Sequence, residues 1–383
     1  MTKKKKKAPS RDIPLPVRCA LWGMAAGRCE RCNRLVYRDP TTKELVNISE
    51  AAHIIGFSKD GPRGEKELSA ELAKDVGNLM LLCRICHRTI DTNKAAYPIS
   101  LLQPLKREHE SRVEIQTGVD KSRSSHILLY GANIGDLARR LSYDDAAPAL
   151  LPLWYPADTT PIALLGSSST FRDRNDVFWR TECEHLENWV AQHVLPRLAS
   201  GDIRHLSIFA LAPQPLLIQL GALLTDIPPA EVYQLHREPP DWCWAGQSDA
   251  LEFIVEEPQR TDAMPALVLS LSAEVTDERI TAVVGQDAAI WRMTVEAPHN
   301  DIVKSRDHLR AFRETVRPLM DRIKAKHGQG TPLHVFPVVP ASIAVEFGRI
   351  QMPKAHMPLC IYDQNRDRGG FVKALEIGNG EGT

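Results

Sequence analysis

Four cysteines near the start of the chain have the spacing of a metal-binding cluster. Cys29 and Cys32 form one Cys-x-x-Cys pair, and Cys83 and Cys86 form a second pair further along the chain. Two such pairs usually supply four thiolates to one Zn²⁺ ion in a tetrahedron. Because four thiolates complete the coordination of the ion, the spacing predicts a structural zinc with no open position for catalysis.

Three further polar residues within or beside this frame could perform hydrolysis: His53, Asn78 and His87. A neutral His can take a proton from water near pH 7, and a divalent cation can stabilise charge on a phosphate. We therefore predict His53 as the base, His87 as a ligand of a catalytic Mg²⁺ or similar ion, and Asn78 as the residue that holds the His53 loop. Either histidine alone would be interpreted as a surface or zinc-supporting residue, and only the combination favours a nuclease.

The elements that must position these residues can be predicted from the sequence pattern. Residues 35–48 contain two apolar runs around a turn and are predicted to form a hairpin that leads to His53. Residues 78–83 are typical of a short buried strand, and helical character follows Cys86. Residues 58–75 are polar and contain glycine, so we expect a mobile surface loop there. Such a nuclease needs two strands followed by a helix, with zinc holding them together.

Composition indicates a soluble globular protein of more than one domain. The chain has 383 residues, of which 43% are hydrophobic and 25% charged, so it can bury sizeable cores. The cysteines outside the frame are scattered without a disulfide-like pattern, which favours a reducing bacterial cytoplasm. No secretory segment is expected, and the most apolar stretch, residues 206–224, contains Pro213 and Pro215 and is predicted not to cross a membrane.

The net charge of zero conceals an asymmetry along the chain. Up to Ser125 there are 24 Lys and Arg against 15 Asp and Glu, a balance of +9, and the remainder balances at −9. A basic front part fits a polyanionic substrate such as DNA. Residues 1–16 are predicted to be a disordered basic tail, and the lysines at 3–7 can equally be a solubilising run.

The region beyond residue 125 alternates apolar strands with helices and contains an internal repeat. Residues 206–213 and 333–340 share a strand length, a central Phe and a closing Pro. Gly221 and Gly348 each follow that Pro at the same distance. Two ordinary strand–helix units could agree by chance, but the equal spacing favours a duplicated half-domain in an α/β fold.

Leading strands also echo each other, at 162–169 and 267–273, and a long helix follows each. We therefore place the two halves at about residues 126–260 and 261–383, after a polar linker at 119–125.

Residues 17–118 resemble the HNH endonuclease family, on the basis of the cysteine frame and the three polar residues described above. The resemblance implies a zinc-stapled α+β domain of the ββα-metal fold, and the same catalytic roles for those residues. One feature departs from the family pattern. Many members carry an acidic or His metal ligand just before the first His, where this chain has Ala52. The second metal ligand is left open between Glu50 and a water.

Residues 126–383 resemble the SAVED domain, a fusion of two CARF-like (Rossmann-like) halves, through the runs 337–349 and 361–363 and the Pro353–Lys354 pair. Together the two regions resemble the HNH–SAVED effector nucleases of CBASS antiphage signalling. The resemblance implies that a cyclic di- or trinucleotide, made after phage infection, activates cleavage of double-stranded DNA and so causes abortive infection. We expect the ligand to act by assembling a homo-oligomer, since an always active nuclease would kill its host.

In open α/β sheets, ligands sit at the carboxyl ends of strands and at helix amino ends. Here those places are residues 167–172, 212–214, 270–272 and 340–342, and nearby aromatic rings such as Trp244 could stack on bases. Any one tryptophan could instead belong to a core. The residues predicted to contact the ligand are Tyr155, Ser168, Phe171, Arg172, Gln214, Trp242, Ser272 and Lys354.

Two other functions are compatible with these patterns. One is a modification-dependent HNH restriction endonuclease whose C-terminal domain reads modified DNA, although a balance of −9 there is unlike a DNA-reading surface. The other is a non-enzymatic zinc-ribbon DNA-binding adaptor.

Overall fold

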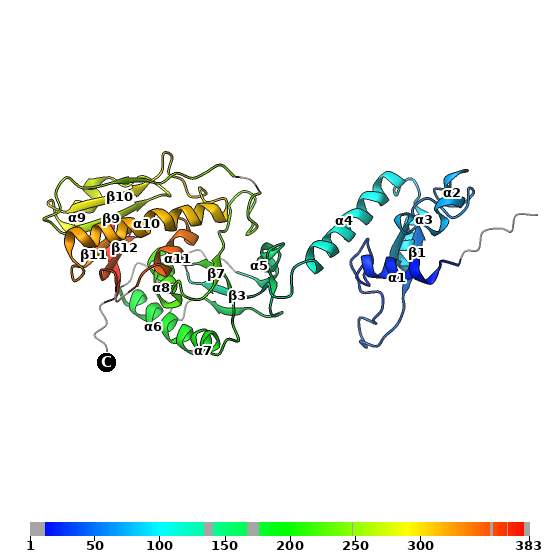
Figure 1. Cartoon of the computed structure of the whole chain (residues 1–383), viewed down its shortest axis with the longest axis horizontal. Coiled ribbons are helices and arrows are strands. Elements are labelled where there is room, and N and C mark those ends of the chain that lie inside the picture. Colours follow the sequence, from blue (N-terminus) through cyan, green and yellow to red (C-terminus); the bar gives the residue numbers. More distant parts are fainter. Residues whose placement is uncertain are drawn as a thin grey trace, which may run out of the picture. The chain divides into compact units, whose positions relative to one another are not determined.

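The computed structural model describes residues 12–133, 141–166, 176–246, 248–352, 355–365 and 367–378. The chain forms two compact units, Met1–Asp120 and Lys121–Thr383 (Figure 1). Most of the predicted tail, residues 1–11, lies outside the described residues. In the described part of the chain, every helix is too short or too polar to cross a membrane.

The N-terminal unit is a small α+β fold with one antiparallel strand pair. Strand β1 pairs with β2 in a register that puts His53 opposite Leu79. Every residue of β2 is buried, so this short strand forms the centre of the unit. The elements are α1 Leu15–Met24, β1 Ser49–His53, α2 Leu68–Glu71, the 3₁₀ helices η1 Leu72–Lys74 and η2 Val76–Asn78, β2 Leu79–Cys83, α3 Arg84–Thr92 and α4 Ile99–Thr117.

The predicted hairpin at 35–48 forms as a loosely paired turn, and the separate strand β1 that follows it carries His53. The turn forms, since Asp39 accepts hydrogen bonds from the backbone N–H groups of Thr41 and Thr42, both at 2.8 Å. Its arms pair through an isolated bridge between Arg38 and Leu45 and through backbone hydrogen bonds from Val46 to Tyr37 at 3.0 Å and from Ile48 to Val36 at 2.9 Å. Val36 on the first arm is buried, whereas Leu45 on the second arm is 82% exposed. The strand that pairs with β2 is β1, which follows this segment.

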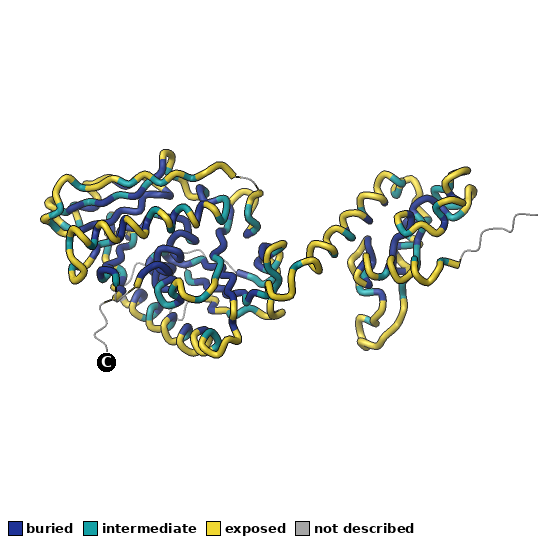
Figure 2. Tube along the Cα trace, viewed as in Figure 1, coloured by how far each residue is buried: buried dark blue, intermediate teal, exposed yellow. Residues whose placement is uncertain are grey.

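The C-terminal unit is an α/β fold built on two sheets, as predicted. A six-stranded sheet has the order β13-β12-β11-β9-β10-β8, and a five-stranded sheet has the order β4-β3-β6-β7 with β5 also paired to β3. Figure 2 shows that the buried residues follow the central strands and the helices α8 and α11.

The elements of the first half of this unit are β3 Ser124–Gly131, α5 Tyr143–Ala146, the 3₁₀ helix η3 Ala147–Leu150, β4 Tyr155–Pro156, β5 Ile162–Leu165, α6 Asp176–His193, α7 Leu195–Ala199, β6 Leu206–Leu211, α8 Gln214–Leu224 and β7 Ala230–Val232. Those that follow are β8 Ile254–Glu256, β9 Pro265–Ser270, α9 Asp277–Val284, β10 Ala289–Thr294, α10 Arg306–His327, β11 Leu333–Val338, α11 Ala341–Arg349, β12 Leu359–Asn365 and β13 Gly370–Ile377.

The two halves repeat the same topology. The parallel order β5-β3-β6-β7 in the first sheet matches the order β10-β9-β11-β12 in the second. Strands β6 and β11 and helices α8 and α11 therefore correspond, as the repeat predicted. The prediction that the leading strands β5 and β9 are equivalent is wrong. By position in the sheets, β5 corresponds to β10, and the counterpart of β9 in the first half is β3. All of them are short apolar runs, although β5 pairs with β3 at the edge of its sheet and is mostly not buried, so sequence pattern alone could not distinguish them.

The repeated glycines lie where α8 and α11 cross. A Cβ atom on Gly221 would lie 2.1 Å from the carbonyl oxygen of Val345, and one on Gly348 would lie 1.9 Å from that of Ile218. No side chain can occupy either position without moving a backbone, so only glycine allows the two helices this approach. The equal Pro-to-Gly spacing is thus the signature of a pseudo-symmetric helix pair that joins the two halves.

Candidate functional site

The four predicted cysteines form one cluster in the N-terminal unit. The sulfur atoms of Cys29, Cys32, Cys83 and Cys86 all lie within 4.8 Å of one another, which makes them able to hold a metal ion. The local fold accounts for this proximity, since Cys83 ends β2 and its Sγ caps the amino end of α3, 3.5 Å from the N–H of Cys86. Three of the four residues are buried.

Neighbouring groups make this cluster suitable for a dication such as Zn²⁺. Burial raises the pKa of the Cys86 thiol to about 12, so the thiolate form needs a nearby cation. The guanidinium of Arg31 donates a hydrogen bond to Cys86 Sγ at 3.3 Å, and also to the hydroxyl of Tyr97 at 2.6 Å. A tetrahedral ion with four sulfur ligands would stabilise the thiolates, and it would connect the segments that carry the two cysteine pairs.

His53 lies at the end of β1 with one ring nitrogen engaged. Its Nε2 is 3.0 Å from the carbonyl oxygen of Ala73, and its ring meets the ring of Phe57 edge to face at 5.6 Å. A carbonyl oxygen can only accept, so Nε2 carries the hydrogen in this arrangement. The lone pair of Nδ1 is then the one available to take a proton.

Asn78 connects the segment after His53 to the segment before β2. Its Oδ1 accepts from the N–H of Ile55 at 2.8 Å, and its Nδ2 donates to the carbonyl oxygens of Ile55 at 3.0 Å and Leu72 at 3.2 Å. The backbone oxygen of Asn78 accepts from Ile54 at 2.9 Å. The side chain is buried, so these bonds are shielded from water and fix the path of the chain after His53.

His87 lies on the first turns of α3 between two carboxylates. Its Nδ1 is 2.7 Å from Glu50 Oε2, and its Nε2 is 3.3 Å from Asp91 Oδ2, one turn further along the helix. Glu50 comes from β1, where sequence analysis left it open as a metal ligand. One imidazole nitrogen with carboxylate oxygens is a donor set suited to Mg²⁺ or Mn²⁺. Two ligands at right angles in an octahedral Mg²⁺ site lie roughly 3 Å apart, so either pair fits such an ion.

Two residues of this site were missed by sequence analysis. Asp91 had a usable signal, because its spacing of four from His87 on a helix puts both on one face. Arg63 had no usable signal in the sequence, because it belongs to a segment that was predicted to be a mobile loop. In the structure its side chain is only 5% exposed and pairs with Asp91 at 2.7 Å.

The predicted ligand residues of the C-terminal unit are only partly brought together. Ser168, Phe171, Arg172 and Lys354 lie outside the described residues. Tyr155 pairs with Ser124 at the amino end of β3, whereas ligands of parallel sheets bind at the carboxyl ends.

Three other predicted ligand residues lie closer to the carboxyl ends of the parallel strands, each in different surroundings: Trp242, Gln214 and Ser272. Trp242 is 4% exposed and meets the ring of Phe209 edge to face at 5.1 Å, so it belongs to the core of the first half. Gln214 accepts from the N–H of Val339 at 3.2 Å. The hydroxyl of Ser272 is buried and has no hydrogen-bond partner in the part of the chain that the structure describes.

The amino end of α11, where a phosphate was expected, instead binds side chains of the first half. The side chain of Gln234 accepts from the N–H of Ser342 at 3.1 Å and from its hydroxyl at 2.7 Å, at the start of α11. Together with the Gln214–Val339 contact, these bonds use backbone donors of the second half to bind amide oxygens of the first half. The expected phosphate position at 340–342 is therefore occupied by a protein group.

A second polar cluster links the halves through Arg306, the first residue of α10. The Arg306 guanidinium pairs with Glu231 and lies 5.7 Å and 5.8 Å from the ring centres of Tyr233 and Trp244. Nearby, Nδ1 of His236 is 3.5 Å from Asp301 Oδ1. We call these six residues the inter-half cluster.

The inter-half cluster contains buried polar atoms that make no hydrogen bond to the described residues. They include Nη2 of Arg306, Nε2 of His236 and Nε1 of Trp244. Burial also lowers the pKa of Arg306. Buried donors without acceptors are costly unless another group satisfies them. The combination of aromatic faces, a cation and unsatisfied donors suits a ligand with bases and anionic groups.

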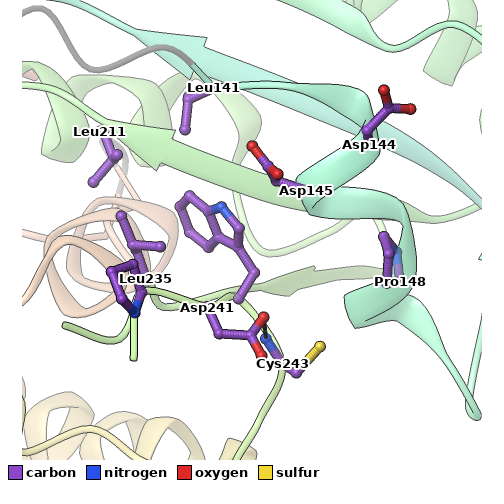
Figure 3. A pocket seen from close by; sticks show the side chains of 10 residues that line it. Leu141, Asp144, Asp145, Pro148, Leu211, Leu235, Asp241 and Cys243 are labelled. Atoms are coloured by element: carbon purple, nitrogen blue, oxygen red, sulfur yellow. Dashed lines mark hydrogen bonds between the residues drawn. The ribbon is translucent and has the colours of Figure 1, made fainter. Parts of the chain in front are cut away.

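A separate pocket lies beside Trp242 in the first half (Figure 3). Its volume is about 560 Å³, and its walls include three carboxylates, those of Asp144, Asp145 and Asp241. Asp241 accepts from the N–H of Cys243 at 3.0 Å, and this bond lowers the pKa of its carboxyl group. The walls of this pocket repel phosphate, whereas the inter-half cluster contains the guanidinium of Arg306 as well as its two carboxylates and is the better candidate for a phosphate-bearing ligand.

Comparison with known proteins assigns both units. The family model for the SMODS-associated and fused to various effectors sensor domain (SAVED) matches residues 186–377. A family model for HNH endonucleases matches residues 19–95. No curated protein matches the sequence.

Solved structures with a similar fold are Cap4 SAVED/CARF-domain containing receptors. One from Acinetobacter baumannii, determined with a cyclic trinucleotide, has 12% identity and a TM-score of 0.44 over 82% of this chain and 66% of that chain. Another from Moraxella osloensis has 11% identity and a TM-score of 0.40 over 76% and 60% of the two chains. This chain thus spans slightly less than two thirds of the length of these receptors. Since the SAVED match extends over half of the chain, the chain belongs to the SAVED family, and its N-terminal unit is an HNH endonuclease domain.

Proposed function

We propose that this protein is a metal-dependent endonuclease that cuts double-stranded DNA when a cyclic di- or trinucleotide binds its SAVED domain. Antiphage defence by abortive infection is the biological role that we assign to it. The observation that carries the proposal is the presence, in one chain, of an HNH domain with its His53, Asn78 and His87 arrangement and of a SAVED sensor domain.

In the nuclease unit each polar residue has a distinct role. His53 takes a proton from the attacking water at Nδ1, because Ala73 engages its Nε2. Asn78 holds the segment after His53 through its bonds to Ile55 and Leu72. His87 with Glu50 or Asp91 would hold Mg²⁺ or a similar ion, which when bound supplies charge stabilisation at the phosphate.

The charge distribution supports DNA as the substrate of this unit. The residues up to Ser125 balance at +9, and those after it at −9. A basic surface concentrates a polyanion near the site without reading its sequence, which suits indiscriminate cleavage. The acidic remainder would add repulsion, so we assign no DNA contact to the SAVED unit.

In the sensor unit the inter-half cluster is our candidate for the ligand site. Arg306 would pair with a phosphate, and the partly exposed Trp244 would stack on a base. Because the cluster combines residues of both halves, a ligand bound there can change the angle between them. A population shift from mostly inactive to mostly active needs a preference of roughly 5 kcal/mol for the active state, which we expect to be expressed as formation of a homo-oligomer.

The test is a plasmid cleavage assay with Mg²⁺, run with and without a panel of cyclic di- and trinucleotides, alongside mass measurement in solution. We expect the free protein to be silent, and one cyclic nucleotide to raise the mass and the cleavage over the same concentration range. Vigorous cleavage by the ligand-free protein would favour the restriction endonuclease. DNA binding without cleavage under every condition would favour the zinc-ribbon adaptor.

A further inference from the structure

The segment after His53 is a tightly closed loop that delivers one arginine into the nuclease site. Gly56 donates a backbone hydrogen bond to Arg63 at 3.2 Å, and Gly61 donates one to Ser58 at 2.9 Å. A Cβ on Gly56 would lie 2.2 Å from the carbonyl oxygen of Pro62. The loop is therefore closed by its own backbone, and its compactness requires glycine at this contact.

Arg63 itself has a left-handed backbone, with φ at +53°. Residues other than glycine rarely adopt this conformation, and they persist in it where their surroundings impose it. Here the surroundings are the contacts of the side chain, which is 5% exposed.

The guanidinium of Arg63 contacts both elements that carry the catalytic histidines. Toward β1 it donates to the carbonyl oxygens of Ile54 at 2.9 Å and of His53 at 3.2 Å. Toward α3 it donates to the carbonyl oxygen of Ile90 at 3.3 Å and pairs with Asp91 at 2.7 Å. A planar group with several donors in fixed directions is needed for this set, and lysine cannot reproduce it.

Asp91 extends this connection to the second histidine. One of its oxygens binds Arg63, and the other lies 3.3 Å from Nε2 of His87. A continuous path of contacts thus runs from the backbone of His53 through Arg63 and Asp91 to the ring of His87. Because Arg63 is nearly inaccessible to water, solvent cannot replace these bonds if the guanidinium is removed.

We propose that Arg63 is a positioning residue of the nuclease, which fixes the base His53 relative to His87 and its metal. This inference rests on the proposed function for its catalytic readout. Arg63 touches neither the reacting atoms nor the metal in this assignment. It acts through the carbonyl oxygen of His53 and through Asp91.

The main test compares Arg63→Lys with Arg107→Lys, a control at an exposed position of α4. Both changes keep the charge, so the electrostatic attraction of DNA is matched. We expect Arg63→Lys to lower kcat by about 10²-fold, because small displacements of catalytic groups have effects of that size. Its KM for DNA should stay unchanged, while the Mg²⁺ concentration for half-maximal rate should rise. Arg107→Lys should behave as wild type.

A second variant keeps the proposal testable if Arg63→Lys does not fold. Arg63→Gly suits the left-handed backbone and leaves a space that guanidinium ion can fill. We expect guanidinium, but not ammonium at equal ionic strength, to restore part of the lost rate. A folded Arg63→Lys with wild-type kcat and metal dependence would overturn the proposal, as would an inactive Arg63→Gly that guanidinium leaves inactive.

Two measurements are independent of nuclease activity. Amide hydrogen exchange at Ile54 and Ile55 should accelerate in Arg63→Lys, and Mn²⁺ binding followed by electron paramagnetic resonance should weaken. If the wild-type protein never cleaves DNA, the proposed function falls. The exchange and Mn²⁺-binding measurements would still decide whether Arg63 holds β1 and α3 together. Unchanged values for both would refute this role of Arg63.

Discussion

The N-terminal and C-terminal units stabilise their folds with different kinds of contact. In the N-terminal unit the short strand β2 is the buried centre, and cysteines, Arg63 and Asn78 tie the surrounding segments to it. The C-terminal unit has a large apolar core on two sheets, and its helices α8 and α11 meet at glycine contacts. Small domains bury a smaller fraction of their surface, which is why the first unit needs a staple and the second does not.

This difference places function where each fold can support it. A unit held by polar contacts keeps buried carbonyl oxygens, amides and imidazoles at fixed positions, as catalysis requires. A unit held by two apolar halves can transmit a change in the angle between them, as sensing requires. One polar exception in the C-terminal unit, the ion pair of Arg306 with Glu231, lies where the two halves meet.

The largest expected effect tests the staple. Cys83→Ser removes one thiolate of the cluster, and because metal-binding energy is folding energy in such a unit, the N-terminal unit should lose its cooperative unfolding transition. The C-terminal unit should unfold as in wild type. Zinc content reports loss of the metal, and calorimetry of the whole chain resolves the unfolding transitions of the two units. Cys19→Ser, at an exposed cysteine outside the cluster, is the control. Full activity of Cys83→Ser after chelation would show that the zinc assignment is wrong.

The next effect tests whether chemistry is confined to the N-terminal unit. His53→Ala should lower the cleavage rate by roughly 10²–10⁴-fold, because it removes a general base. Zinc content and cyclic nucleotide binding should not change, since His53 lies outside the thiolate cluster and in the other unit. His87→Ala should also inactivate the enzyme, with partial recovery in excess Mg²⁺. Cleavage by His53→Ala near the wild-type rate would remove this residue from the mechanism.

A third change tests the apolar joint of the C-terminal unit. A Cβ at Gly348 would lie 1.9 Å from the carbonyl oxygen of Ile218, so Gly348→Ala must separate α8 from α11. We expect a loss of roughly 3 kcal/mol in the unfolding free energy of this unit alone. The control is Gly330→Ala, where a Cβ would have no neighbour within 4 Å. Equal stability of the two variants in denaturant titrations would contradict the close helix contact.

A fourth change separates the two candidate ligand regions. Trp244→Ala should weaken cyclic nucleotide binding by about 1–3 kcal/mol, the usual value of one base-stacking contact. Trp242→Ala should instead destabilise the unit, because that ring packs on Phe209. Isothermal titration and thermal unfolding of both variants give the answer. Loss of binding in a stably folded Trp242→Ala would move the ligand to the pocket in Figure 3.

The smallest effect concerns pH. Burial lowers the pKa of His205 to about 4, and its ring stacks on Trp154 at 3.6 Å. The unfolded state binds the proton more readily than the folded state does. The contribution of neutral His205 to folding stability is therefore complete above a pH of about 6.5, and it is lost as the pH falls toward the pKa of His205 in the folded state. Acidification from pH 6.5 to 5.5 should cost about 1 kcal/mol. His205→Gln should flatten this dependence in calorimetry of the C-terminal unit, whereas an unchanged slope would exclude His205 as its source.

Local sequence determined the parts of this protein that depend on spacing. Two Cys-x-x-Cys pairs predicted the metal cluster, because the strand-to-helix junction at Cys83 and the short loop at Cys29 each present two sulfurs. Equal Pro-to-Gly distances predicted the repeated strand–helix units, since the same crossing imposes the same residue on both copies. Periodicity and residue type suffice where neighbours in the chain are also neighbours in space.

Only the tertiary structure decided the contacts between distant segments. The strand that carries His53 could be told from the preceding hairpin only by its pairing with β2. Arg63 acquired its place because a closed loop returns it beneath the backbone of His53, next to Asp91 on another element. The backbone donors at the start of α11, where a phosphate was expected, instead bind Gln214 and Gln234 of the first half. Each of these outcomes depends on which polar groups meet after burial, and burial is a property of the whole fold rather than of any segment.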